Sequence, residues 1–224
     1  MCGKFTQMAT WAEIVSWKIG ETPAEALARG QREAREVGGG AADDGIVLAT
    51  PMRMAAILRL NDQGAREMTM MRWGFTKAGS TQPRPDYMHA RAETIDTRPT
   101  FRDSFAHRRG LCFVRTFNEG EEVGKKTVQW TVTPKDGKPL AIAVIYEEWI
   151  NGDQRLFTFV QVTTPPNPLI ATITDRMPAI IPEEHQSLWL GETGAPLDEV
   201  KAILQPYDDA GGWEFAPEPK KPRR

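Results

Sequence analysis

The chain has 224 residues, of which 40% are hydrophobic and 26% charged, and its formal net charge is −2 at pH 7. This composition is typical of a soluble globular protein and allows one large domain or two small ones. It excludes a polycation, and no stretch approaches the apolar length that a membrane span needs. The two cysteines and three histidines show no zinc-ligand spacing. So few cysteines favour a reducing cytoplasm over a disulfide framework.

Two helix-start signals lie near the N-terminus. Capping boxes occur at Thr10-Trp11-Ala12-Glu13 and at Thr22-Pro23-Ala24-Glu25, the second with proline at the first helical position. The second helix is polar on most sides and should end at Gly38-Gly39-Gly40, so we expect it on the surface. Charged and polar residues interrupt any apolar core in this region, so no signal peptide is expected.

Extended, apolar runs dominate the rest of the chain. Strands are predicted at Ile46–Thr50, Met52–Leu60, Glu67–Trp73, Gly110–Phe117, Thr127–Thr133, Leu140–Glu147 and Leu156–Thr163. Helices are predicted around Thr100–Arg108, Glu183–Leu190 and Leu197–Leu204. Many strands that do not alternate regularly with helices favour a single α+β domain. We expect this domain to span residues 1–212 and the Pro/Lys/Arg-rich segment 213–224 to be a disordered tail.

One segment is rich in arginine. Between Arg84 and Arg115 the chain carries seven arginines and four acidic residues. A phosphate-binding face would need such an excess. A solvated surface with local ion pairs explains it equally simply, and charge alone favours this second interpretation.

Cys2 has the most distinctive potential chemistry. If Met1 is removed, Cys2 becomes the amino terminus and carries an amine and a thiol on adjacent carbons. This pair can condense with an aldehyde, first to an imine and then to a five-membered thiazolidine. The reference pKa values of the amine, about 7.7–8.0, and of the thiol, about 8.5, place both near neutrality. A chance cysteine beside the start codon is the alternative, and the first residues alone do not decide between them.

Several separated motifs together resemble one family. The chain is similar to the SRAP family (SOS-response-associated peptidases, also called abasic-site processing proteins). The motifs that carry this resemblance are Met1-Cys2-Gly3-Lys4-Phe5, Arg72-Trp73-Gly74-Phe75, His89-Ala90-Arg91-Ala92-Glu93-Thr94, Phe117-Asn118-Glu119, Val162-Thr163-Thr164 and Asp175-Arg176-Met177-Pro178. The resemblance implies one domain with a curved, barrel-like mixed β structure and flanking helices. It also implies binding of single-stranded DNA with abasic sites and capture of the sugar aldehyde by Cys2.

The resemblance implies catalytic roles for four residues. Cys2 would be both the imine-forming amine and the ring-closing thiol, and Glu119 would transfer protons beside it. Alternatively, Glu119 belongs to an acidic turn. His89 replaces a family asparagine, and Thr174 replaces a family histidine. Threonine is no acid or base near neutral pH, so His89 takes over part of that role or the chemistry is slower or lost. Asn118 and Gly120 replace aromatic residues that flank the glutamate in the family.

The resemblance also assigns DNA contacts. Phosphates would be bound by Lys4, Arg91, Arg98, Arg102, Arg176, Thr163 and Thr164, and bases would stack on Trp73 and Phe75. Trp73 could equally be a core aromatic, and Arg91 could be a structural partner of Glu93 or Asp96.

We expect no metal, cofactor or membrane, a monomeric chain, and a cytoplasmic location. Two competing functions stay open: a non-covalent single-stranded DNA-binding protein, and a self-processing peptidase with an N-terminal cysteine. Some members of the family also cleave the DNA strand by β-elimination.

Overall fold

The structure, a computed structural model, describes residues 4–7, 47–77 and 79–218. Cys2 and the helices predicted to begin after Thr10 and Thr22 lie outside these residues. Within the described part of the chain, no helix is long and apolar enough to cross a membrane.

The described strands form one mixed sheet of eleven members. They are β1 (Lys4–Gln7), β2 (Val47–Ala49), β3 (Met54–Leu60), β4 (Arg66–Trp73), β5 (His89–Arg91), β6 (Arg109–Val123), β7 (Lys126–Pro134), β8 (Leu140–Asn151), β9 (Gln154–Thr164), β10 (Met177–Pro178) and β11 (Trp213–Pro217). The helical elements are η1 (Ala92–Thr94), α3 (Arg102–His107), η2 (Ile170–Thr172), η3 (Glu183–His185), α4 (Gln186–Leu190) and α5 (Leu197–Ala202).

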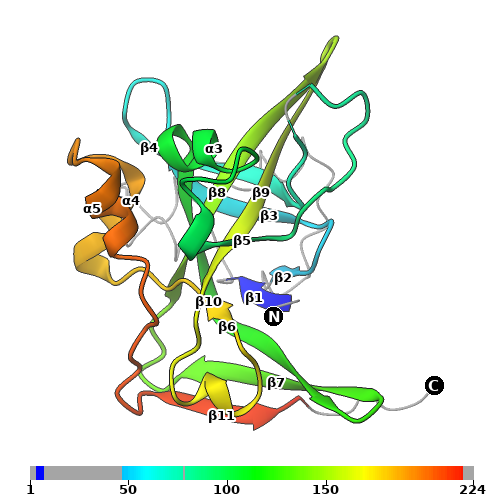
Figure 1. Cartoon of the computed structure of the whole chain (residues 1–224), viewed down its shortest axis with the longest axis vertical. Coiled ribbons are helices and arrows are strands. Elements are labelled where there is room, and N and C mark those ends of the chain that lie inside the picture. The colour runs from blue at the N-terminus through cyan, green and yellow to red at the C-terminus, as the bar shows by residue number, and fades with distance from the viewer. Residues whose placement is uncertain (1–3, 8–46, 78, 219–224) are drawn as a thin grey trace, which may run out of the picture.

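Strand pairing curves the sheet strongly. The pairs β3–β4, β4–β9, β9–β8, β8–β6 and β6–β3 follow one another and return to the first strand. In this series the β4–β9 pair is parallel and the other four pairs are antiparallel. Strand β5, outside the series, also pairs in parallel with β9. The predicted single α+β domain with a curved, barrel-like mixed sheet is therefore confirmed (Figure 1).

Strand β6 belongs to two parts of the sheet. Its first half pairs with β3 and β8, and its second half pairs with β1 and β7. Strand β11 adds to the outer edge of β7. Figure 1 shows the resulting layer of β6, β7 and β11 below the curved part, with β1 next to the point where β6 crosses between them.

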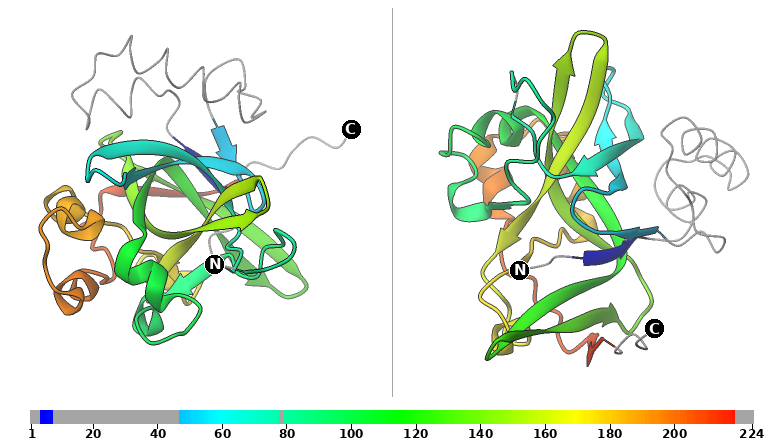
Figure 2. Two further views of the ribbon diagram at one scale, coloured as in Figure 1. Left: turned by 90° about the horizontal axis from the view of Figure 1, so that it is seen from above. Right: turned by 90° about the vertical axis from the view of Figure 1, so that its right-hand side faces the viewer.

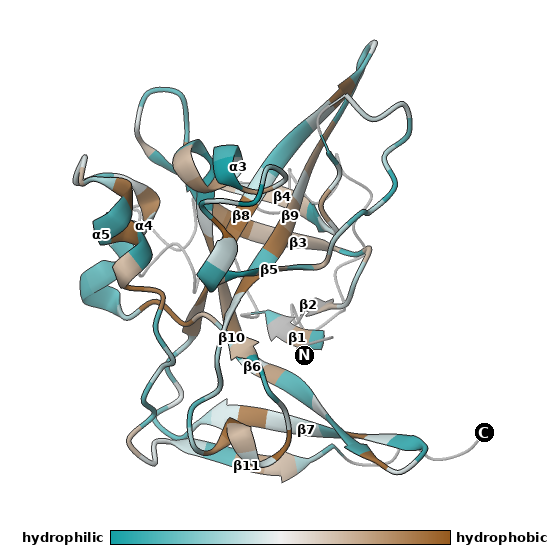
Figure 3. Cartoon of the chain, viewed as in Figure 1, coloured by the Kyte–Doolittle hydropathy of each residue, from teal (hydrophilic) through white to brown (hydrophobic). Residues whose placement is uncertain are grey.

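Two apolar clusters cover the two faces of the sheet. Successive side chains of a strand point to opposite faces, so in β9 Phe159 and Val160 belong to different clusters. The cluster of Val160 also contains Phe105 of α3 and Trp189 of α4, which places the helices on this face. Figure 2 shows α4 and α5 together beside the sheet, and Figure 3 shows hydrophobic residues along the central strands.

The predicted start of the disordered tail, at residue 213, is too early. Residues 213–217, predicted to be disordered, form β11, and Trp213 pairs with Pro134. The Trp213 side chain is buried and its ring centroid lies 5.5 Å from that of Phe117. Because the partner strand is far away in the sequence, local composition gave no sign of this pairing. The ordered domain therefore extends through residue 217, past the predicted boundary at 212.

Candidate functional site

Glu119 lies in the second half of β6 and is fully buried. Its register partner on β7 is Trp130, and its neighbour Asn118 pairs with Lys4 of β1. Because side chains alternate, Glu119 shares a face with Phe117, whose partner on β1 is Phe5. The alternative assignment of Glu119 to an acidic turn is therefore wrong: the residue is in a paired strand, and the turn comes later.

Lys4 lies on the other face of this strand pair. Its side chain is on the same side as Asn118, whose amide donates to Thr131 Oγ1 over 2.8 Å. The Lys4 ammonium makes an ion pair with Glu218, just after β11. This contact joins the beginning and the end of the described chain, so a phosphate at Lys4 would compete with Glu218.

His89 begins β5 and is partly exposed. Its register partner on the parallel neighbour β9 is Gln161. The His89 ring meets Trp73 edge-on, with centroids 5.9 Å apart, and the Trp73 ring lies 5.1 Å from that of Phe5. Trp73 thus joins strand β1, which follows Cys2 in the sequence, to the strand that carries His89.

The predicted stacking surfaces are buried. Trp73 is 0% exposed and Phe75 is 1% exposed. The Trp73 indole donates to Met88 O over 3.0 Å, and Phe75 packs edge-on against Phe101 at 5.6 Å. A base needs an open ring face, so the stacking prediction is wrong for both residues, and the core interpretation of Trp73 is correct.

Arg176 is a structural residue in this fold. Its guanidinium is buried, forms a two-pronged ion pair with Glu93, and donates to the carbonyl and hydroxyl oxygens of Thr163. The hydrogen bond from Arg176 is the main reason that the pKa of Glu93 is lowered. These contacts bind the segment before β10 to η1 and β9. The predicted phosphate contact of Arg176 is therefore corrected to an internal one.

The three threonines differ in access. Thr163 is 2% exposed and Thr164 is 0% exposed, so neither hydroxyl reaches a phosphate on the surface, contrary to prediction. Thr174 is partly exposed, follows η2, and donates its backbone N–H to Ile170 O over 3.0 Å. It lies two residues before Arg176 and therefore near the β9–β10 pair.

Three predicted phosphate ligands are exposed, namely Arg91, Arg98 and Arg102. Arg91 follows His89 by two positions on β5, so both side chains leave the same face. The ion-pair partner of Glu93 is Arg176, and that of Asp96 is Lys201 at 2.7 Å. The charge of Arg91 acts on Glu93 as well, as one of the smaller causes of its lowered pKa.

An aromatic pair on the face of Glu119 was not predicted from the sequence. Trp130 stacks on Phe215 of β11 with ring centroids 4.5 Å apart and an interplanar angle of 13°. Both rings are partly exposed, and the Trp130 indole donates to Glu121 over 2.8 Å. Because Trp130 is opposite Glu119 in register, it is on the face of β6 that carries Glu119, whereas Asn118 and Gly120 are on the other face.

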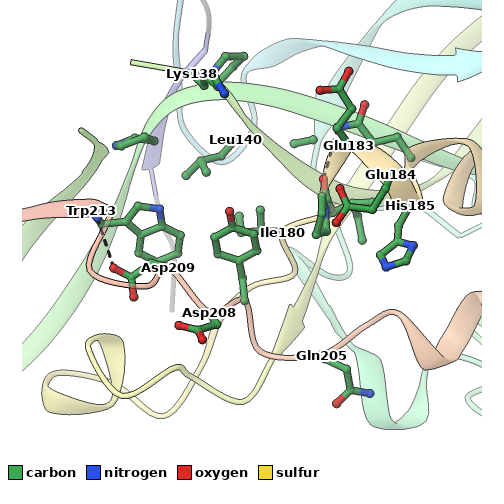
Figure 4. Close-up of a pocket in the computed structure, with 18 of the residues that line it drawn as sticks. Lys138, Leu140, Ile180, Glu183, Glu184, His185, Gln205, Asp208, Asp209 and Trp213 are labelled. Atoms are coloured by element: carbon green, nitrogen blue, oxygen red, sulfur yellow. Dashed lines mark hydrogen bonds between the residues drawn. The ribbon is translucent and has the colours of Figure 1, made fainter. Parts of the chain in front are cut away.

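A cavity of about 930 Å³ lies apart from these residues, between the β7–β8 turn, η3 and the segment before β11 (Figure 4). None of the predicted site residues lines it. Among the described residues, no group of three or more His, Cys, Asp or Glu side chains could hold a metal ion.

Comparison with known proteins decides the family. The sequence model described as SOS response associated peptidase (SRAP) matches residues 1–217. The chain belongs to the SRAP family. This match begins with the Met-Cys-Gly segment and ends with β11, so it covers every predicted site residue.

Relatives of this SRAP protein include curated bacterial sequences. The abasic site processing protein YoqW of Bacillus subtilis is 31% identical over 153 residues, which cover 66% of this chain and 68% of the relative. The abasic site processing protein YobE of the same organism is 29% identical over 154 residues, covering 66% and 70%.

Solved structures share the fold of this SRAP protein. A protein from Bacteroides thetaiotaomicron superimposes with a TM-score of 0.78 at 20% identity, covering 96% of this chain and 91% of that one. A protein from Bordetella bronchiseptica gives a TM-score of 0.75 at 20% identity, covering 98% and 100%. At this identity the likeness speaks for the fold alone.

Proposed function

We propose that this protein processes abasic sites in single-stranded DNA by capturing the ring-opened sugar aldehyde on Cys2. The observation that carries the proposal is the position of Glu119: a fully buried carboxylate on β6, one residue from the register partner of Lys4. Membership of the SRAP family and the names of the Bacillus relatives support the substrate.

The covalent chain keeps Cys2 close to this carboxylate's strand. Two residues span at most about 7 Å when fully extended, and Lys4 is paired with Asn118. The proposal requires the amine and thiol of Cys2 to meet the second half of β6 within this length of chain. A carboxylate buried there can accept a proton from the amine and return it to a leaving hydroxyl.

The proposed reaction has three balanced steps. The neutral amine of Cys2, freed by removal of Met1, adds to the aldehyde carbon and gives a carbinolamine. The carboxyl group of Glu119 protonates the hydroxyl, water leaves, and a protonated imine and the Glu119 carboxylate remain. That carboxylate takes the proton of the Cys2 thiol, the thiolate adds to the carbon of the protonated imine, and the thiazolidine closes with a neutral nitrogen.

The DNA would approach over exposed groups. Arg91 supplies a guanidinium on the same face as His89, and Trp130 and Phe215 supply a partly exposed aromatic pair opposite Glu119. Stacking of a base on such a ring contributes about 1–3 kcal/mol and tolerates any sequence. His89 would contact the reacting sugar as donor or acceptor.

A crosslinking assay tests the proposal. A uracil-containing single strand treated with uracil glycosylase is incubated with the protein and resolved on a denaturing gel. We expect a heat-stable shifted band that disappears in Cys2→Ala and persists in Cys112→Ala, which removes the other, buried cysteine. Glu119→Gln should slow formation of the band. A band that survives Cys2→Ala refutes the role of Cys2.

Two further measurements separate the alternatives. Intact mass shows whether Met1 is absent, because a retained Met1 blocks the amine and excludes both the crosslink and a peptidase that uses the same terminus. Salt-sensitive binding to single-stranded DNA without any heat-stable adduct would instead support a non-covalent binding protein.

A further inference from the structure

The cavity of about 930 Å³ has a wall and a charge that the proposed chemistry does not use. We call it the acidic cavity. It is lined by residues of the β7–β8 turn (134–141), of η3 and its neighbours (180–186), and of the segment 202–213. Its volume is in the range of pockets that hold drug-sized ligands or short peptide segments.

The floor of the acidic cavity is apolar and aromatic. Leu140 and Ile180 form part of it, and Trp213 lies at one end (Figure 4). Tyr207 stacks on Trp213 with ring centroids 5.5 Å apart and an interplanar angle of 11°, and it is partly exposed. Prolines at positions 134, 139, 182 and 206 complete a wall that is rigid and poor in hydrogen-bond donors.

The rim of the acidic cavity carries carboxylates from three separate segments. Figure 4 shows Asp209 and Trp213 at one end and Glu183 and Glu184 at the other, with Asp208 between them. Asp136 belongs to the third segment. The lining has five carboxylates and two lysines, so the lysines balance the negative charge only in part. Lys135 donates to Gly211 O over 2.7 Å, and the Lys138 ammonium is 3.8 Å from the Asp136 carboxylate.

The negative charges of the carboxylates affect Tyr207, which belongs to the aromatic floor of the cavity. Burial and the charges of Asp136, Glu184, Asp209 and Asp208 raise the pKa of Tyr207. Asp209 is held in place, since it accepts hydrogen bonds from the Asn167 amide and from Trp213 N, each at 3.3 Å. A negative potential over an aromatic ring attracts cations and repels DNA phosphates. The acidic cavity therefore suits a partner other than the DNA.

We propose that the acidic cavity is a docking site for an extended, basic, proline-containing peptide segment of another protein. Aromatic grooves recognise such segments because the polyproline conformation is already formed and costs little entropy on binding. The carboxylates occur along the cavity rather than at one point, which fits several basic side chains on an extended backbone better than one compact cation. The function of this site is independent of the chemistry at Cys2.

Fluorescence anisotropy with a labelled peptide tests this proposal. The probe is Pro-Lys-Lys-Pro-Arg-Arg, a sequence of the required kind, and the comparison peptide is Pro-Gln-Gln-Pro-Gln-Gln. We expect the basic peptide to bind the full chain with a dissociation constant on the order of 100 μM or tighter at low salt. Binding should weaken as salt rises. Failure to bind at about 1 mM would overturn the proposal.

Matched variants locate the site. The double variant Glu184→Gln with Asp208→Asn should weaken peptide binding about tenfold or more. The control Glu199→Gln with Asp153→Asn removes the same charge at exposed positions outside the cavity and should change binding less than about twofold. Equal effects of the two double variants would mean that the peptide senses only net charge and would overturn the site.

Two further binding experiments test which ligand the acidic cavity prefers. Spermine should bind more weakly than the peptide, and equal affinity with the same dependence on Glu184 and Asp208 would overturn the peptide assignment. The probe has the sequence of residues 219–224 of this chain. A full-length variant in which glutamine replaces the four basic residues there should bind it with unchanged affinity; tighter binding would assign the acidic cavity to the chain's own segment.

Discussion

Replacing Arg176 with methionine should destabilise the fold and leave the single-strand affinity almost unchanged. Arg176 is 8% exposed as a residue, and its guanidinium makes two hydrogen bonds to Glu93 and two to Thr163. Methionine keeps much of the length and apolar contact but removes every one of these bonds. The variant therefore isolates the polar contribution of Arg176.

The expected loss follows from the exposure of the partners. Breaking a fully buried ion pair costs about 3–5 kcal/mol. The Glu93 side chain is 47% exposed, however, and water can solvate it once it is released. The carbonyl of Thr163 has no such access, and a buried acceptor left unpaired costs about 1–3 kcal/mol. We expect the free energy of unfolding to fall by about 2–4 kcal/mol.

Urea unfolding followed by tryptophan fluorescence measures this change as a shift of the midpoint to lower urea. Glu93→Gln should cost less, and the double variant should cost less than the sum of the two, with a coupling of about 1 kcal/mol or more. The control is Arg91→Met: this exposed residue should change stability by less than about 0.5 kcal/mol but reduce the salt slope of single-strand binding by about 0.7.

The reverse pattern would show that Arg176 binds DNA. If Arg176→Met left stability within about 0.5 kcal/mol and lowered the salt slope by about 0.7, the guanidinium would be a phosphate ligand. The ion pair with Glu93 would then be a resting contact that DNA displaces.

Three other changes give separate tests. Arg176 lowers the pKa of Glu93 below its ordinary 4.5. The pair therefore stabilises the fold above pH 4.5, and this contribution is lost as the pH falls through the lowered pKa. In acid titrations, Glu93→Gln should flatten that part of the curve of stability against pH. Gly110→Ala should lower the melting temperature, at a cost of about 2 kcal/mol or more, because the added Cβ would lie 2.7 Å from Ile57 Cγ2 and 2.9 Å from Leu58 O; an unchanged melting temperature would contradict this close packing. Gln161→Met should raise stability by about 1 kcal/mol in urea unfolding, since the amide is fully buried and makes no hydrogen bond to the described residues; a clear loss would mean that the amide binds water or a ligand.

The sequence predicted the elements that local patterns define. The runs at Met52–Leu60 and Glu67–Trp73 became β3 and β4 with small shifts, and α3 formed within Thr100–Arg108. These segments show their burial in their own composition. Strand β6 was predicted to end at Phe117 but extends to Val123, into a polar run, because β7 pairs with it there.

The features that were not predicted from the sequence share a physical cause. The short strands β5 and β10 are extended because β9 offers its edge to them, and their own residues give no periodic pattern. The burial of two predicted DNA ligands was also not evident from the sequence. Trp73 packs between Phe5 and Phe159. Arg176 is bound by Glu93 and Thr163. A motif gives the types and spacing of residues in one segment. The exposure of their side chains depends on residues that pack against them from elsewhere in the chain.

The contact between Lys4 and Glu218 joins positions 214 residues apart, and this separation has a consequence for synthesis. The N-terminal segment leaves the ribosome first, while β11 and Glu218 arrive last. At about 5–20 residues per second the interval is about 10–40 s. During that time Lys4 lacks Glu218, and β6 lacks its pairing with β7 until β7 has been made. The ion pair between the two ends of the described chain therefore forms only after synthesis has reached Glu218, and slower translation lengthens the time that β1 spends without it.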